Sequence, residues 1–227
     1  MLKKKNKIVK LRQGIKKEKM KIVIYCLIMV SLGCQTKPKS LSDYPDITNI
    51  FEAYEIDDLE KIIDSFNKSI CKSENLKGTD VLECYEHYFT RMQKAVETGR
   101  LEFQLPYAEQ EKLMKELDIR SFYEVWGNLR TWKRGSDTLK VVNNKYNGKY
   151  IKFLKSFSKE NIKKKKYVFS YENIGDISPT MIADIVTNFN EYDIRDERIK
   201  LLIAIHYLTL NERNKIHEIL NSANNKS

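Results

Sequence analysis

Hydrophobic residues recur every three or four positions along most of the chain, which is the spacing of one face of an α-helix. Two such runs cover residues 58–70 and 81–96, and Asn75-Leu76-Lys77-Gly78 interrupts the pattern between them. We therefore predict two amphipathic helices joined by a short turn, an αα-hairpin. The apolar positions of the pair are Leu59, Ile62, Ile63, Phe66, Ile70, Val81, Tyr85, Tyr88, Phe89, Met92 and Val96.

The rest of the chain predicts further helices of differing character. Helical spacing continues at residues 106–117, 122–126 and 150–157, and helix is favoured over strand at residues 162–174, where the period is ambiguous. Ser178 can cap a helix that has Pro179 at its first position, where a missing amide donor costs nothing. Residues 201–210 are apolar nearly all round, which predicts a helix surrounded by others, and residues 211–220 predict a last short helix.

Residues 127–147 give no clear pattern, because Leu139-Lys140-Val141-Val142 fits a strand as well as a helix. The whole chain has only 8 glycines and 4 prolines in 227 residues, which favours helices over a many-turned β architecture. We predict an all-α protein with a single irregular helical domain of roughly seven to nine helices. This domain is expected at residues 44–221, with a disordered tail at residues 222–227.

The formal net charge of +10 raises the question of nucleic-acid binding, so its distribution matters. Residues 1–33 contain ten lysine or arginine residues and one acid, Glu18, so nine of the ten net charges fall there. The remaining chain carries a charge of about +1 and lacks the clustered positive field that attracts phosphate backbones. We therefore expect no nucleic acid among the partners.

The basic N-terminal stretch leads into about a dozen mostly apolar residues, 22–33, and then Cys34. This order is typical of a signal peptide. A helix of that length rises only ~18 Å, whereas the hydrocarbon core of a bilayer is ~30 Å thick. A spanning anchor is therefore not expected, and an ordinary secretory signal is one interpretation. Met20 is an alternative start, since it would begin a compact signal by itself.

The residues Val30-Ser31-Leu32-Gly33-Cys34 resemble the lipobox of bacterial lipoproteins, although Ser31 replaces the commonest leucine. The resemblance implies that residues 1–33 are removed and that Cys34 carries a diacylglycerol on its thiol and an acyl chain on its amine. Two or more chains give durable membrane attachment. Residues 34–43 would then form the lipidated, flexible tether. The Lys- and Asn-rich helical remainder resembles lipoproteins of Bacteroidetes-type bacteria, which implies location and no activity.

Cys71 and Cys84 remain once Cys34 is lipidated, and an even pair in an oxidising compartment suggests a disulfide. Antiparallel packing of the two predicted hairpin helices would bring them close enough. Two free thiols are the first alternative. The second is a metal or nucleophile site that adds Glu83 and His87, although no second ligand pair has recognisable spacing.

Other candidate chemistry has a structural explanation beside it. His206 lies in an apolar run, which predicts a hydrogen-bonded core histidine. The four lysines at residues 163–166 could contact anionic lipid headgroups or an acidic partner, but a solvated helix face explains them better. Aromatic residues could line a ligand groove, although helical spacing places most of them in the core. These aromatic residues are Tyr85, Tyr88, Phe122, Trp126 and Trp132.

No phosphate-binding glycine loop, haem-attachment motif, zinc-protease helix or nucleophile elbow occurs in the chain. We therefore assign no catalytic residue, metal or cofactor. The leading hypothesis is a lipid-anchored envelope lipoprotein on the periplasmic or outer-membrane side, whose helical domain binds another protein or an envelope component without catalysis. One form of it is an immunity-like protein that neutralises a toxin. The rival hypothesis is a hydrolase of cell-envelope glycan.

Overall fold

The computed structural model describes residues 39–73, 75, 76, 78, 80–97, 105–134, 137–160, 162–174 and 177–224. Residues 39–227 form one compact unit. The predicted signal peptide and Cys34 lie outside the described residues, so they stay predictions.

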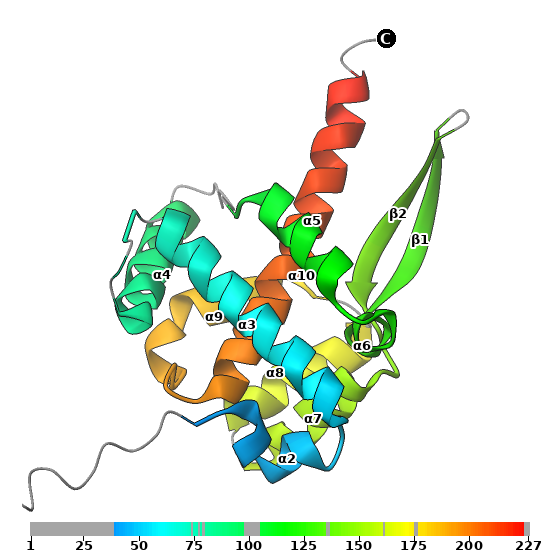
Figure 1. The fold of residues 1–227 in the computed structure, drawn as a ribbon. Coiled ribbons are helices and arrows are strands. Elements are labelled where there is room, and N and C mark those ends of the chain that lie inside the picture. Colours follow the sequence, from blue (N-terminus) through cyan, green and yellow to red (C-terminus); the bar gives the residue numbers. More distant parts are fainter. Residues whose placement is uncertain are drawn as a thin grey trace, which may run out of the picture. The chain divides into compact units, whose positions relative to one another are not determined.

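The described chain is all-α apart from one β-hairpin, which confirms the predicted fold class (Figure 1). Its nine α-helices fall within the predicted range. They are α2 (Pro45–Thr48), α3 (Ala53–Ser73), α4 (Val81–Glu97), α5 (Tyr107–Glu116), α6 (Ile119–Val125), α7 (Lys149–Phe157), α8 (Ile162–Ile174), α9 (Pro179–Thr187) and α10 (Glu197–Asn224). The strands are β1 (Trp126–Arg134) and β2 (Asp137–Asn144), and the short 3-10 helices are η1 (Leu41–Asp43), η2 (Ser158–Glu160) and η3 (Phe189–Glu191).

Helix α10 is the centre of the fold, and every residue from 201 to 210 is buried. α3, α5 and β2 lie against it, as expected for a helix that is apolar nearly all round. The predicted break at residue 211 is wrong, because α10 continues to Asn224 and includes part of the predicted tail. Asn211 and Glu212 are polar, but both are buried and hydrogen-bonded to other elements, so their polarity does not end the helix.

Helices α3 and α4 form the predicted αα-hairpin. The structure brings Cys71 and Cys84 together in a disulfide, with α-carbons 4.9 Å apart. After α3, Asn75 adopts the left-handed conformation with φ 58°, which asparagine tolerates at helix ends. The side chain of Cys84 is fully buried, whereas the side chain of Cys71 is partly buried at the edge of the core. The disulfide therefore joins the first hairpin helix to the core side of the second.

Replacing both Cys71 and Cys84 with alanine is expected to lower the free energy of unfolding by about 2 to 3 kcal/mol, because the unfolded chain is no longer restricted by the disulfide. The loss is at the lower end of the usual range because the loop that the disulfide closes is short. Urea denaturation with and without reductant measures the effect. Reductant should destabilise the natural chain by the same amount and leave the double variant unchanged. Equal stability of the natural chain in both conditions would contradict a structural disulfide.

The folded part of the chain begins earlier than the predicted tether boundary at residue 43. Leu41 is fully buried, and the Ser40 hydroxyl donates to Oε1 of Glu60 over 2.7 Å. Ser40 and Asp43 also form a capping box around η1, in which each side chain accepts from a backbone amide. The polar composition of residues 39–43 hid this structure, since only Leu41 enters the core.

The unassigned segment 127–147 forms the β-hairpin. Its strands are antiparallel, and the register runs from Trp126 opposite Asn144 to Arg134 opposite Asp137. A register shift between Asn128 and Arg130 places one extra residue in β1, which is a β-bulge near the base of the hairpin.

Candidate functional site: the hairpin and its support on α10

The hairpin and the last turns of α10 extend from the same end of the helical body, and α2 lies at the opposite end (Figure 1). β2 is the strand that lies along α10. β1 pairs with β2 alone in a two-stranded sheet, so within the described residues the outer edge of β1 has no strand partner.

The base of the hairpin is fixed to α10 through Thr209. The fully buried indole of Trp126 donates from Nε1 to Oγ1 of Thr209 over 2.8 Å, and Asn144 Nδ2 donates to the same oxygen over 3.3 Å. The Thr209 hydroxyl itself donates to the carbonyl of Ile205 over 2.7 Å. One buried hydroxyl thus joins both strands to the core helix.

Arg213 makes a second connection one turn further along α10. Its Nε donates to Oδ1 of Asn143 over 2.6 Å, and its Nη1 donates to the carbonyl of Ile177 over 3.2 Å. Hydrogen bonds from a charged donor are stronger than neutral ones, so this contact holds β2 in a defined position.

The opposite side of α10 carries a buried polar network with α5. Gln110 Nε2 donates to Glu212 Oε1 and to the carbonyl of Leu208, each over 2.9 Å, and Asn211 Nδ2 donates to Gln110 Oε1 over 2.8 Å. Burial raises the pKa of Glu212. The pKa of Tyr107 is raised to about 12, mainly by burial and secondly by the nearby Glu212 carboxylate. The network explains how polar residues continue α10 beyond the apolar run.

Replacing Thr209 with valine is expected to lower the free energy of unfolding by about 1 to 2 kcal/mol, because two buried donors lose their acceptor. Amide hydrogen exchange should accelerate first at the base of β1 and β2. Thr187→Val is the matched control, since Thr187 is exposed and its hydroxyl donates to the carbonyl of Ala183, four residues back in the same helix. Equal effects of the two substitutions would show that Thr209 does not hold the hairpin.

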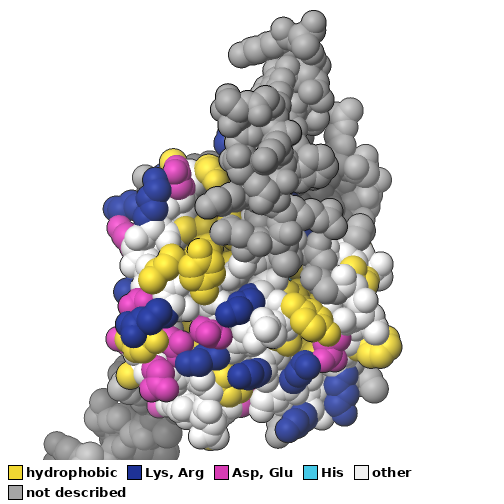
Figure 2. Space-filling view, turned by 90° about the vertical axis from the view of Figure 1, so that its right-hand side faces the viewer, with side chains coloured by type: hydrophobic (Ala, Val, Ile, Leu, Met, Phe, Trp, Pro, Cys, Tyr) yellow, Lys and Arg dark blue, Asp and Glu magenta, His cyan; other side chains and the backbone are white. Residues whose placement is uncertain are grey.

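Exposed apolar side chains also occur on the face beside the hairpin base. Tyr123 on α6 and Tyr146 in the turn before α7 are 42% and 54% exposed. Figure 2 shows that hydrophobic side chains on this face form separate groups, with lysine and arginine side chains between them. No single continuous apolar patch is therefore visible in this view.

A pocket of about 420 Å³ lies between α4 and the segment from η3 to α10. Glu86, Glu191, Asp193 and Arg195 contribute charged groups to its wall. Within the described residues, no group of three or more His, Cys, Asp or Glu side chains could hold a metal ion. A second pocket, of about 270 Å³, lies between α3 and α5, and Asp64, Glu109 and Glu116 are in its wall, so the acid–base chemistry of the rival hydrolase hypothesis would be sought in both pockets.

Of the residues singled out in the sequence, the two tryptophans belong to β1, whereas the two histidines and the acid beside the disulfide lie on helices. Glu83 and His87 are exposed on α4, so they do not converge on the disulfide. His206 is fully buried and its Nδ1 is hydrogen-bonded to the Tyr167 hydroxyl over 2.9 Å, as predicted for a core histidine. The indole of Trp126 is a core side chain, as expected, whereas the side chain of Trp132 lies outside the described part.

The sequence contained a signal for the hairpin that the periodicity did not reveal. Gly135-Ser136 stands as a two-residue spacer between two runs that contain Thr131 and Thr138. A glycine followed by serine between β-forming runs is typical of a tight hairpin turn. This signal would have assigned the segment that helical spacing left open.

The described fold defines an all-α protein class with one β-hairpin anchored on its central helix. Comparison of the chain with protein families, with curated proteins and with solved structures finds no match. Among the helices that the structure describes, none has the length and apolar character needed to cross a membrane.

Proposed function

We propose that this chain is a lipid-anchored envelope lipoprotein that binds another protein, without catalysis, at the hairpin end of its helical domain. The observation that carries the proposal is the hairpin: a two-stranded sheet whose base is clamped to α10 and whose β1 edge has no strand partner in the described chain.

Small β-sheets are weakly stable by themselves. A two-stranded hairpin is at best marginally stable in water, and an open edge offers a row of backbone donors and acceptors to another chain. Clamping such a hairpin to the core keeps that edge in a fixed place. An extended segment of a partner protein can add to β1 as a third strand, and its side chains then supply specificity.

The lipid anchor rests on the sequence Val30-Ser31-Leu32-Gly33-Cys34. Lipidation at Cys34 would hold the domain at the membrane and concentrate it near partners in the envelope. An immunity-like role is one form of this function, in which the bound partner is an incoming toxin.

The proposal is tested by photo-crosslinking in the native cell envelope. A photoreactive amino acid replaces Lys133 in β1 in one strain and exposed Lys68 on α3 in a control strain. We expect one saturable crosslinked protein from position 133 and none from position 68. The Cys34→Ala variant should lose both membrane fractionation and this crosslink.

A second variant separates partner binding from folding. Shortening the hairpin by joining Asn128 to Val142 through a two-residue turn removes the distal strands, and circular dichroism then verifies that the helices remain. The crosslinked partner should disappear from pull-downs of this variant. Equal capture by the shortened and natural chains, or no capture by either, would contradict the proposal, and release of sugars from purified envelope glycan would favour the hydrolase instead.

A further inference from the structure

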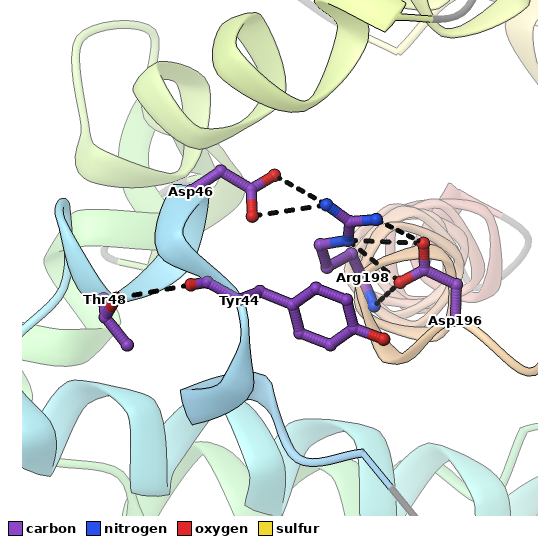
Figure 3. A network of polar contacts seen from close by, with 5 residues as sticks. All are labelled: Tyr44, Asp46, Thr48, Asp196 and Arg198. Atoms are coloured by element: carbon purple, nitrogen blue, oxygen red, sulfur yellow. Dashed lines mark hydrogen bonds and ion pairs between the residues drawn. The ribbon is translucent and has the colours of Figure 1, made fainter.

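The first folded residues are held against the start of α10 by Arg198, as Figure 3 shows. The Arg198 guanidinium forms ion pairs with Asp46 at 3.1 Å and with Asp196 at 2.7 Å. Its Cζ also lies 4.2 Å from the ring centroid of Tyr44, which is a cation–π distance. Tyr44 and Asp46 are thereby fixed at this end of the molecule.

The same arginine connects the N-terminal residues to α7 and α8. Arg198 Cζ lies 4.6 Å from the ring centroid of Phe157, the last residue of α7. The Nζ atom of Lys164, in the first turn of α8, lies 3.5 Å from the same centroid. On the other side, Lys39 Nζ is 5.5 Å from the ring centroid of Tyr44. Lys39, where the described chain begins, and Lys164 in the first turn of α8 are therefore linked through Arg198 and the two aromatic rings that it contacts.

The segment that forms α7, η2 and the start of α8 is strongly basic. Residues 149–166, which form α7, η2 and the start of α8, contain eight lysines and one acid, Glu160. The chain after residue 33 carries only about +1 in total, so the rest of it is net negative. In Figure 2, lysine and arginine side chains gather along the lower right of the face, whereas acidic ones are mostly on its left.

Several of these lysines have no counter-charge in the described chain. The neighbouring acids are already paired, since Asp46 and Asp196 bind Arg198 and Glu172 binds Lys155. The remaining exposed cations with no ion pair to a described residue include Lys152, Lys165 and Lys166. Their positive field is available to an external anion.

An exposed aromatic ring stands among these cations. Phe169 lies one helical turn after Lys165 and Lys166 on α8, so the three side chains share a face. Phe169 is 67% exposed, which is unfavourable in water. At a membrane surface such a ring can enter the acyl boundary while the flanking lysines meet the headgroups.

We infer that the exposed face of α7 and α8 rests on the anionic phospholipid surface of the membrane in which the Cys34 lipid is inserted. This inference rests on the lipid anchor of the proposed function. Only five residues lead from Cys34 to Lys39, and such a length spans at most ~18 Å. A tether this short keeps the basic face within contact distance of the headgroups, and each lysine near them adds attraction.

The test measures lysine accessibility in the full chain, purified from its own cell envelope and added to preformed vesicles. One vesicle set is phosphatidylcholine alone, and the other is an equal mixture with phosphatidylglycerol. A membrane-impermeant amine reagent followed by mass spectrometry gives the labelling rate of each lysine. Flotation of the same samples on neutral vesicles reports the lipid anchor independently.

We expect anionic vesicles to slow labelling of Lys152, Lys165 and Lys166 about fivefold or more relative to neutral vesicles, and ~1 M salt to remove the difference. Exposed Lys68 on α3 and Lys94 on α4 should label equally in both. The Lys165→Glu/Lys166→Glu variant should lose protection at Lys152. The Lys68→Glu/Lys94→Glu variant, which changes the net charge equally, should keep it.

The two proposals fail in different ways. Flotation on neutral vesicles without lysine protection on anionic ones would overturn the membrane-facing surface and leave the anchor standing. Lysine protection on anionic vesicles without flotation on neutral ones would overturn the anchor and support the surface. Protection in the native envelope but not on vesicles would assign the basic face to an acidic macromolecule and overturn the inference.

Discussion

Replacing Gly148 with alanine is expected to lower the free energy of unfolding by about 3 kcal/mol or more, as a severe case of overpacking. Gly148 precedes α7, and a Cβ atom at this position would lie 2.2 Å from the carbonyl oxygen of Glu124 on α6. A backbone atom cannot move aside as a flexible side chain can. The Lys149 amide also donates to the Glu124 carboxylate over 2.8 Å, so a shift of this turn would break that bond as well.

Gly127→Ala is the matched control for this prediction. A Cβ atom at Gly127 would meet its nearest neighbour, Cβ of Lys145, at 3.9 Å, which is ordinary van der Waals contact. We therefore expect the control to change the free energy of unfolding by less than about 1 kcal/mol. Urea denaturation at constant m-value compares the two variants. A similar loss in both would contradict the close approach of α6 to the turn before α7.

Acid is expected to destabilise the protein through His206, by about 2 kcal/mol at pH 5 and about 3 kcal/mol at pH 4. Burial lowers the pKa of His206 from 6.5 to about 3. Between these two pH values, His206 therefore binds a proton in the unfolded chain but not in the folded chain. The contribution of neutral His206 to the free energy of unfolding is therefore present above pH 6.5 and is lost as the pH falls toward 3.

The structure explains why His206 resists protonation. Its Nδ1 bonds the Tyr167 hydroxyl, its Nε2 has no hydrogen-bond partner among the described groups, and the Tyr207 ring packs against it at 5.0 Å. His206→Asn removes the titrating group while keeping an acceptor for Tyr167. Denaturation from pH 7 to 4 should show a shallower loss of stability in this variant, although it is less stable at pH 7. Parallel pH profiles would assign the acid sensitivity to other groups.

The parts of the fold that the sequence predicted are those determined by local spacing. The apolar positions of α3 and α4 recur regularly, and the disulfide followed from two cysteines near facing helix ends. Ser178 caps α9 as predicted, since its Oγ accepts from the Met181 amide over 3.2 Å. Each of these features depends on residues close together in the chain.

The parts that the sequence did not predict depend on distant residues. Asn211 and Glu212 would end a solitary helix, but Gln110, about a hundred positions away, satisfies their side chains within the core. The hairpin likewise needs Thr209 and Arg213 to hold its base.

The length of α10 has a geometric consequence for the lipid anchor proposed at Cys34. A continuous helix of 28 residues is roughly 42 Å long, with Arg198 in its first turn and the clamp on the hairpin midway along it. A hydrogen-bonded helix of this kind resists bending, so it acts as a rigid spacer between its two ends. With the Arg198 end at the lipid surface, the β1 edge would stand at a fixed height above the headgroups, where only partners that extend to that height could engage it.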